Sequence, residues 1–125
     1  MKILVFGNAD LEMDSVPLKI LPSLKKEFPK DIFEIKDPNE ELDIGPDSII
    51  IDTVVGIEKI EVFTEIEKFS RSPRITMHDF DLATQLKYLK KLGKLPKLKI
   101  IGVPPTIPPE TALKEISAML RSNRS

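Results

Sequence analysis

The hydrophobic positions of this chain form three short, mainly continuous runs, within residues 3–6, 48–53 and 98–103. Strands that helices cover on both faces have continuous apolar runs, whereas half-exposed strands alternate apolar and polar residues. These runs therefore predict the central parallel strands of an α/β sheet. Two weaker segments complete the sheet, because 32–35 has the mixed polarity of a short strand and 59–63 alternates as an edge strand does.

Apolar residues at helical spacing predict three helices, over about residues 15–28, 81–92 and 110–120. Pro17 falls in the first turn, where its missing N–H costs nothing, whereas Pro22 predicts a bend or a restart of the first helix. The turn before 59–63 is too short for a helical crossover, so that edge strand is expected to be antiparallel. The pattern predicts one three-layer αβα domain over residues 1–125, with a mostly parallel, twisted five-stranded sheet. The residues from Arg121 onward are expected to fray.

Composition narrows the class of protein. The chain has 19 lysines and arginines against 20 acidic residues, so it offers no basic field to a nucleic-acid backbone. It has no cysteine, which excludes disulfides, thiolate metal sites and cysteine nucleophiles. No apolar run approaches the roughly 18 residues of a membrane span, and no signal-peptide pattern is present. We expect a cytoplasmic protein with no membrane partner, and abundant Lys, Glu and Pro resemble an archaeal or thermophile-like composition.

Three polar residues are expected at the carboxyl edge of the sheet. Asp14 follows the first strand, Asp52 closes the third, and His78 lies in the loop before the 81–92 helix. Ligands of open α/β sheets bind at this edge, and two carboxylates with an imidazole suit zinc, nickel, iron or cobalt with positions left open. Each residue also has an explanation that involves no metal. Asp14 could cap a helix, Asp52 could cap a turn, and His78 could be an ordinary surface residue.

Other α/β proteins fit the sequence less well. A dinucleotide fold needs G-x-G-x-x-G after the first strand, but Ala9 and Glu12 occupy the later glycine positions. A phosphate-receiver domain would have acids directly after that strand and a lysine after the last one, where this chain has Gly7-Asn8 and Val103-Pro104. A serine hydrolase is excluded because no G-x-S-x-G turn occurs.

Several segments resemble the hydrogenase maturation endopeptidase family, which trims the C-terminus of nickel-iron hydrogenase large subunits. The matching segments are Gly7-Asn8 with Asp14 six residues later, Ile49 to Thr53, Thr76 to His78, and Ile100 to Pro105. The match spans nearly the whole chain. Met13 and Ser15 stand where the family has a further acid and a glycine.

The resemblance implies an endopeptidase that removes a C-terminal peptide from the nickel-loaded precursor of a hydrogenase large subunit. It implies that Asp14, Asp52 and His78 are the catalytic and metal-contacting residues. The nickel would be supplied by the precursor, no organic cofactor would be needed, and the identity of the general base stays open. The alternative is a non-catalytic α/β binding or assembly module that recognises the precursor or another partner and has lost activity.

Two further charged features have ordinary explanations. Glu12 is interpreted as a solvated loop residue rather than a replacement for the missing acid. A stripe of lysines on the second predicted helix is interpreted as a solvated helix face, with a docking patch as the alternative. The stripe consists of Lys87, Lys90, Lys91 and Lys94.

Overall fold

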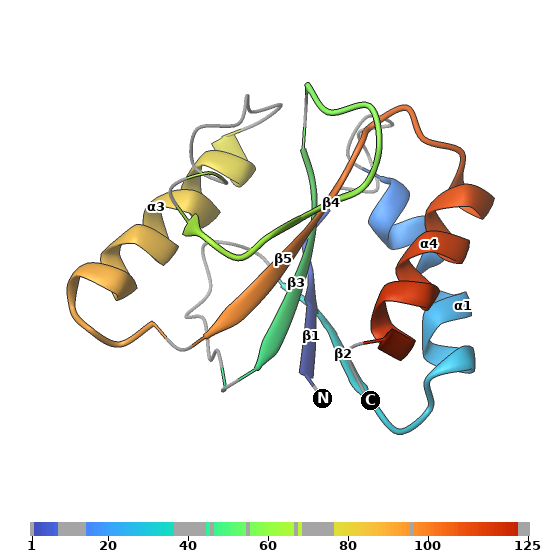
Figure 1. Ribbon diagram of the computed structural model, residues 1–125, viewed down its shortest axis with the longest axis horizontal. Coiled ribbons are helices and arrows are strands. Elements are labelled where there is room, and N and C mark those ends of the chain that lie inside the picture. Colours follow the sequence, from blue (N-terminus) through green and yellow to red (C-terminus); the bar gives the residue numbers. More distant parts are fainter. Residues whose placement is uncertain are drawn as a thin grey trace.

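Strands and helices follow each other along the chain as the hydrophobic pattern predicts. The computed structural model describes residues 2–7, 15–36, 45, 47–54, 56–66, 68, 77–95 and 97–122, with only the backbone of 77–83. In this part of the chain the elements are β1 (Lys2–Val5), α1 (Val16–Glu27), β2 (Ile32–Ile35), β3 (Ser48–Thr53), β4 (Glu61–Phe63), α3 (Met77–Lys91), β5 (Leu98–Val103) and α4 (Pro109–Ser122) (Figure 1). All five predicted strands and all three predicted helices are confirmed.

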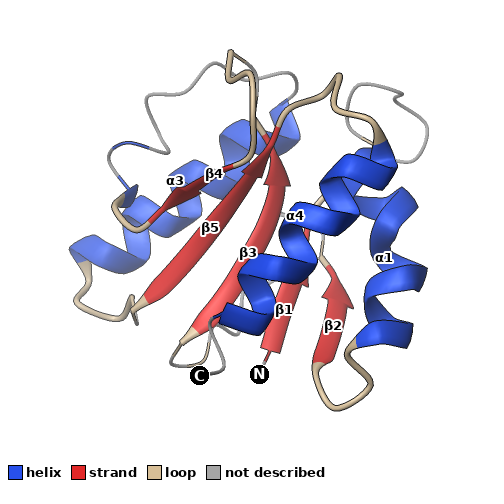
Figure 2. Ribbon diagram, turned by 45° about the vertical axis from the view of Figure 1, so that its right-hand side comes forward, coloured by secondary structure: helices blue, strands red, loops and turns tan. Residues whose placement is uncertain are grey.

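The five strands form one sheet in the order β2-β1-β3-β5-β4. β1 pairs in parallel with β2 and β3, β3 pairs in parallel with β5, and only β4 runs antiparallel to its neighbour (Figure 2). The predicted antiparallel edge strand is therefore confirmed. After β1 the chain adds β2 on one side and then crosses over to place β3 on the other. The strand order thus reverses between β1 and β3, which makes this the topological switch point of the sheet.

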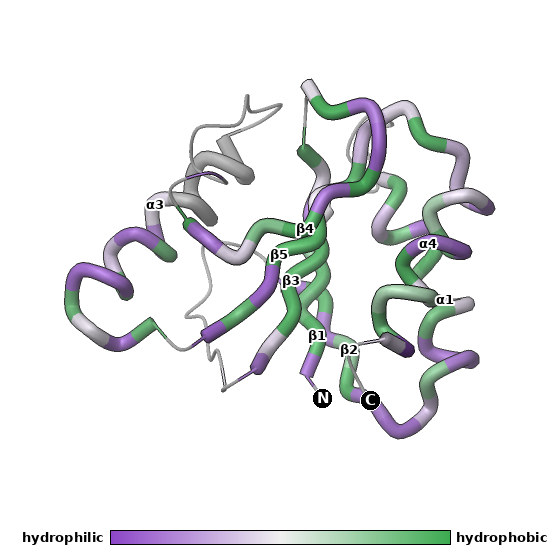
Figure 3. Tube along the Cα trace, in the orientation of Figure 1, coloured by the Kyte–Doolittle hydropathy of each residue, from purple (hydrophilic) through white to green (hydrophobic). Residues whose placement is uncertain are grey.

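Helices cover both faces of the sheet, α1 and α4 on one side and α3 on the other (Figure 1). Successive residues of a strand point to opposite faces, so each central strand contributes to two cores. Ile49 and Ile51 of β3 belong to the core beneath α1 and α4, whereas Ile50 packs with Leu86 of α3. Both faces are apolar, which explains the continuous hydrophobic runs of the central strands (Figure 3).

Helix α1 is continuous across Pro22, so the predicted restart is wrong. The proline removes the hydrogen bond that Leu18 C=O would accept, but its side chain is exposed and thus lies on the solvent side of the helix. Water can reach the helix there, which lowers the cost of the missing bond. Pro17 lies in the first turn, as predicted.

The ends of the other two helices also differ from their predicted positions. α3 begins at Met77 rather than near Asp81, because Met77 and Phe80 of its first turn do not continue the apolar row of Leu82, Leu86 and Leu89. α4 continues to Ser122, so the predicted fraying is wrong for its last two residues. Arg121 donates a hydrogen bond to Glu27 of α1 and is ion-paired with it, which holds this end of α4 in place. No helix in the described residues is long and apolar enough to cross a bilayer.

Candidate functional site at the carboxyl edge of the sheet

Asp52 is the second-last residue of β3 and lies beside the switch point of the sheet. It is 0% exposed, and both carboxylate oxygens are shielded from solvent. Backbone pairing on both sides holds the strand, since Ile51 pairs with Val5 of β1 and Asp52 with Gly102 of β5. Open α/β sheets bind ligands at the carboxyl ends of the strands beside the switch point. The structure therefore places Asp52 at the edge where the sequence predicts it.

The side chain of Asp52 points to the face of the sheet that α3 covers. Ile50, two residues earlier on the same strand, packs in the core beneath α3 together with Phe6 and Ile100. Side chains two positions apart on a strand share a face, so Asp52 continues this row at the sheet edge. The carboxylate consequently belongs to the α3 side and not to the side of α1 and α4.

Apolar groups close in beside Asp52 because its cross-strand neighbour Gly102 has no side chain. A Cβ atom at Gly102 would lie 2.8 Å from Phe63 Cε2 and 2.9 Å from Val54 Cγ2. The side chains of Phe63 and Val54 therefore occupy the space above Gly102, and both are buried. An ionised carboxylate in such surroundings requires compensation by hydrogen-bond donors or a cation. This environment suits recognition of a positive charge.

His78 lies in the first turn of α3, and not in the loop before the helix as predicted. The 15 residues of α3 span roughly 22 Å, about the height of a six-residue strand. Since α3 leads into the amino end of β5, its first turn lies at the opposite, carboxyl edge (Figure 1). The backbone of His78 is thus at the same edge and on the same face of the sheet as Asp52. Its side chain lies outside the described part of the structure.

Asp14 also lies outside the described residues, but its neighbour Ser15 marks the start of α1. Ser15 is the N-cap residue and is 3% exposed, and its carbonyl oxygen accepts the N–H of Lys19 at 2.9 Å. Its side chain makes no capping hydrogen bond. The N-cap position, which the sequence analysis considered for Asp14, is therefore occupied by Ser15.

A polar group that the sequence analysis missed lies next to Asp52. Thr53 is 2% exposed, and its Oγ1 has no hydrogen-bond partner within the described residues. By strand alternation it points to the side of α1, opposite to Asp52. Buried hydroxyl groups are nearly always hydrogen-bonded, so Thr53 calls for a partner beyond these residues. Its position at the end of a buried strand, beside a candidate residue, is the signal that could have identified it.

The described residues contain no cluster of three His, Cys, Asp or Glu side chains that could hold a metal ion. A ligand set around Asp52 must therefore draw on side chains outside them, and the predicted partners Asp14 and His78 are two such residues. Ser15, the residue after Asp14, and the backbone of His78 both lie at the carboxyl edge of the sheet.

Comparisons with known proteins point to one kind of fold. No family model matches the sequence, and no curated protein matches it significantly. The hydrogenase maturating endopeptidase HybD from E. coli has a similar structure, with a TM-score of 0.65 and 24% identity over 98% of this chain and 93% of that chain. An endopeptidase from Escherichia coli, solved in solution, has a TM-score of 0.70 and 23% identity over the same shares.

A third similar structure is that of an uncharacterized protein from Wolinella succinogenes. Its TM-score is 0.58 and its identity 16%, over 95% of this chain and 97% of that chain. The likeness to HybD and to the second endopeptidase extends over nearly the whole chain, so this protein has their fold. The resemblance indicated by the sequence is thereby confirmed at the level of the fold.

Proposed function

We propose that this protein is an endopeptidase that removes a C-terminal peptide from the nickel-loaded precursor of a hydrogenase large subunit. The observation that carries the proposal is the fully buried carboxylate of Asp52 at the switch point of the sheet. Electrostatic attraction between this carboxylate and a cation is stronger here than in water, because the site excludes solvent. The fold shared with a hydrogenase maturating endopeptidase supports the same function.

In this proposal Asp14, Asp52 and His78 contact the nickel ion that the precursor already carries. Two carboxylates and one imidazole provide the oxygen and nitrogen donors that such an ion accepts. The contact made by Asp52 is held rigidly, because its strand is paired on both sides. Nickel is then part of the substrate, and a precursor without nickel lacks the charge that the site recognises. Cleavage would accordingly report that the metal has been loaded.

Docking of the nickel ion positions the peptide bond that is cut. Holding the two reacting groups together supplies much of the rate acceleration in such a reaction. A water molecule activated by the metal or by a carboxylate of the site adds to the peptide carbonyl carbon. The carbon–nitrogen bond then breaks, and the amine leaves with a proton.

The variants Asp14→Ala, Asp52→Asn and His78→Ala test this assignment. Changes in the groups that merely orient metal ligands already cost 10–100-fold, so each variant should process nickel-loaded precursor at least about 100-fold more slowly. Asp52→Asn keeps the shape of the side chain, and its free energy of unfolding should lie within about 1 kcal/mol of the wild-type value. Mass spectrometry of the precursor measures the processing, and circular dichroism monitors the fold.

A matched control is Glu115→Gln, which removes an exposed carboxylate on α4 and should leave processing unchanged. Full activity of Asp52→Asn would contradict the site assignment. The same assay with and without nickel separates the two candidate functions. A nickel-dependent loss of mass supports the endopeptidase, whereas binding of the precursor without cleavage supports the non-catalytic module.

A further inference from the structure

Charge is unevenly distributed along this chain, and the most basic segment of the chain begins within α3. Residues 82–109 contain no aspartate or glutamate, although the whole chain has a net charge of −1. The six lysines of this segment are Lys87, Lys90, Lys91, Lys94, Lys97 and Lys99. The rest of the chain is therefore acidic. Four of the six lysines lie in the last part of α3 or just after it, which concentrates positive charge there and attracts anionic groups.

Among the described residues, no acidic side chain neutralises three exposed lysines at the end of α3 and just after it. Lys87, Lys91 and Lys94 are exposed, and none of them forms an ion pair within the described residues. Elsewhere lysines do find partners, since Lys2 and Lys36 lie 3.7 and 3.4 Å from the carboxylate of Glu34. Lys87 and Lys91 are one helical turn apart, a spacing at which like charges destabilise a helix. Their repulsion would be relieved by an acidic partner.

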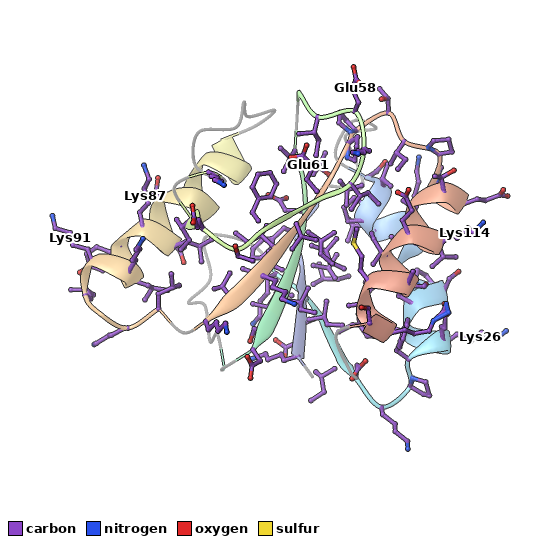
Figure 4. The ribbon with its side chains drawn as sticks, viewed as in Figure 1. Lys26, Glu58, Glu61, Lys87, Lys91 and Lys114 are labelled. Carbon is purple, nitrogen blue, oxygen red and sulfur yellow. The ribbon has the colours of Figure 1, made fainter. Side chains whose placement is uncertain are left out.

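Two large apolar side chains are exposed beside these lysines. Tyr88 is 62% and Leu92 48% exposed, and the two are also one turn apart on α3. We call Lys87, Tyr88, Lys91 and Leu92 the α3 patch. Figure 4 shows Lys87 and Lys91 on the side of α3 that faces away from the sheet. Tyrosine is enriched in protein–protein interfaces, and the rim around their apolar core is polar.

The α3 patch lies on the same helix as a predicted site residue. His78 is in the first turn of α3, and the two lysines of the patch follow nine and thirteen residues later. At the rise of an α-helix this places them roughly 14–20 Å from His78 along the axis of α3. A protein interface of ordinary size, about 800 Å² on each partner, is broad enough to cover both.

We propose that the α3 patch docks an acidic surface of the precursor protein whose C-terminus is cut, an inference that rests on the proposed function. The patch holds the folded body of the precursor while its metal site reaches the carboxyl edge of the sheet. A membrane surface fits less well, because the broad apolar face that a membrane-bound helix needs is turned inward here, with Leu86 fully buried. Nucleic acid is disfavoured by the net negative charge of the chain.

The double variant Lys87→Glu/Lys91→Glu reverses the charge of the patch. Its matched control is Lys26→Glu/Lys114→Glu. This variant changes the net charge of the protein by the same amount, but on α1 and α4 at the opposite side of the sheet (Figure 4). All four lysines are exposed, so both variants should fold, which circular dichroism verifies. A second patch variant, Tyr88→Ala/Leu92→Ala, removes the apolar centre without any change in charge.

Two measurements use the purified hydrogenase large-subunit precursor, namely its Kd by calorimetry and the kinetics of its cleavage when loaded with nickel. We expect Lys87→Glu/Lys91→Glu to raise Kd and KM about tenfold or more and to leave kcat within about twofold. Added salt should weaken binding by the wild type and have little effect on this variant. The Tyr88→Ala/Leu92→Ala variant should also bind more weakly, and the α1/α4 control should bind as the wild type does.

Each outcome bears on docking and on the proposed function separately. Normal cleavage with an unchanged KM in the patch variants overturns docking and leaves the endopeptidase intact. If binding of the precursor depends on the patch but neither the wild type nor any variant cleaves the precursor, the endopeptidase is overturned and docking is supported. Equal weakening by the α1/α4 control overturns docking, because the effect would then be one of net charge. If the protein binds phosphatidylglycerol vesicles through the α3 patch and does not bind the precursor, docking of the precursor is overturned and the patch is a membrane-binding surface.

Discussion

At the scale of single residues, Gly102 decides what surrounds Asp52. The two are paired across β3 and β5, and the missing side chain of Gly102 admits Phe63 and Val54. A glycine inside a strand weakens the strand slightly, but here it allows close packing next to a buried carboxylate. The neighbourhood of Asp52 is therefore apolar on the side of β5. The strength of a charge–charge contact at Asp52 depends on this exclusion of water.

Gly102→Ala should destabilise the protein by about 1–3 kcal/mol, because the added Cβ would overlap two buried side chains. Movement of Phe63 or Val54 beside Asp52 should also slow processing of the precursor. Chemical denaturation measures the first effect and the cleavage assay the second. Gly45→Ala is the matched control, since a Cβ there has Ser48 Oγ at 3.8 Å as its nearest neighbour. A change in unfolding free energy as small as that of the control would contradict the packing argument.

At the scale of elements, α1 and α4 are joined by an ion pair as well as by their core residues. Ser117 Oγ of α4 donates to Glu27 Oε2 at 2.8 Å, and Arg121 donates to the other carboxylate oxygen. Both oxygens of Glu27 are thus engaged by groups on the neighbouring helix. The two helices form one layer, which positions the start of α1, and with it Ser15, against the carboxyl edge of the sheet.

Pro22→Ala should raise the free energy of unfolding by about 1–3 kcal/mol. The alanine supplies the N–H that Leu18 C=O lacks, and it fits the helical backbone that α1 already has at this position. Urea denaturation measures the gain. Pro17→Ala provides the comparison, because a proline in the first turn costs no hydrogen bond; its replacement restores none and removes part of a buried side chain, so stability should not rise. An equal gain for both variants would show that the missing hydrogen bond is not the cause.

At the scale of the whole molecule, protection from solvent falls from the centre of the sheet to its edges. Every residue of β3 is buried, whereas the edge strand β2 exposes Ile32 and Ile35 by 59% and 58%. Helices cover both faces of β3, and strands pair with it on both sides. A central strand of this kind opens only when the domain unfolds, whereas an edge strand can open locally.

Native-state hydrogen exchange should therefore divide the sheet into two classes. We expect the amides of β1 and β3 to exchange only through global unfolding and those of β2 and β4 to exchange through smaller openings of lower free energy. Mass spectrometry of exchanged peptides in increasing denaturant measures the opening free energies. If β2 exchanges as slowly as β3, the sheet is a single cooperative unit and this expectation is wrong.

The sequence by itself determined the elements and much of their arrangement into a parallel sheet. Continuous apolar runs marked the central strands because both faces of those strands are covered, and this signal is local. It also located Asp52, since a carboxylate that ends such a run must lie at the sheet edge. The roles of Asp14, Asp52 and His78 as a metal-contacting set stay predictions.

Only the tertiary structure decided which segments lie next to one another. Strand order placed the switch point between β1 and β3, and no local pattern encodes that order. The same holds for the contact of Arg121 with Glu27, 94 residues apart in the chain, and for the side chains above Gly102. The start of α3 at Met77 also escaped prediction, because Met77 and Phe80 do not continue the apolar row that marks the rest of the helix. Hydrophobic pattern reports how deeply a residue is buried, whereas the identity of its neighbours depends on packing between segments that are distant in sequence.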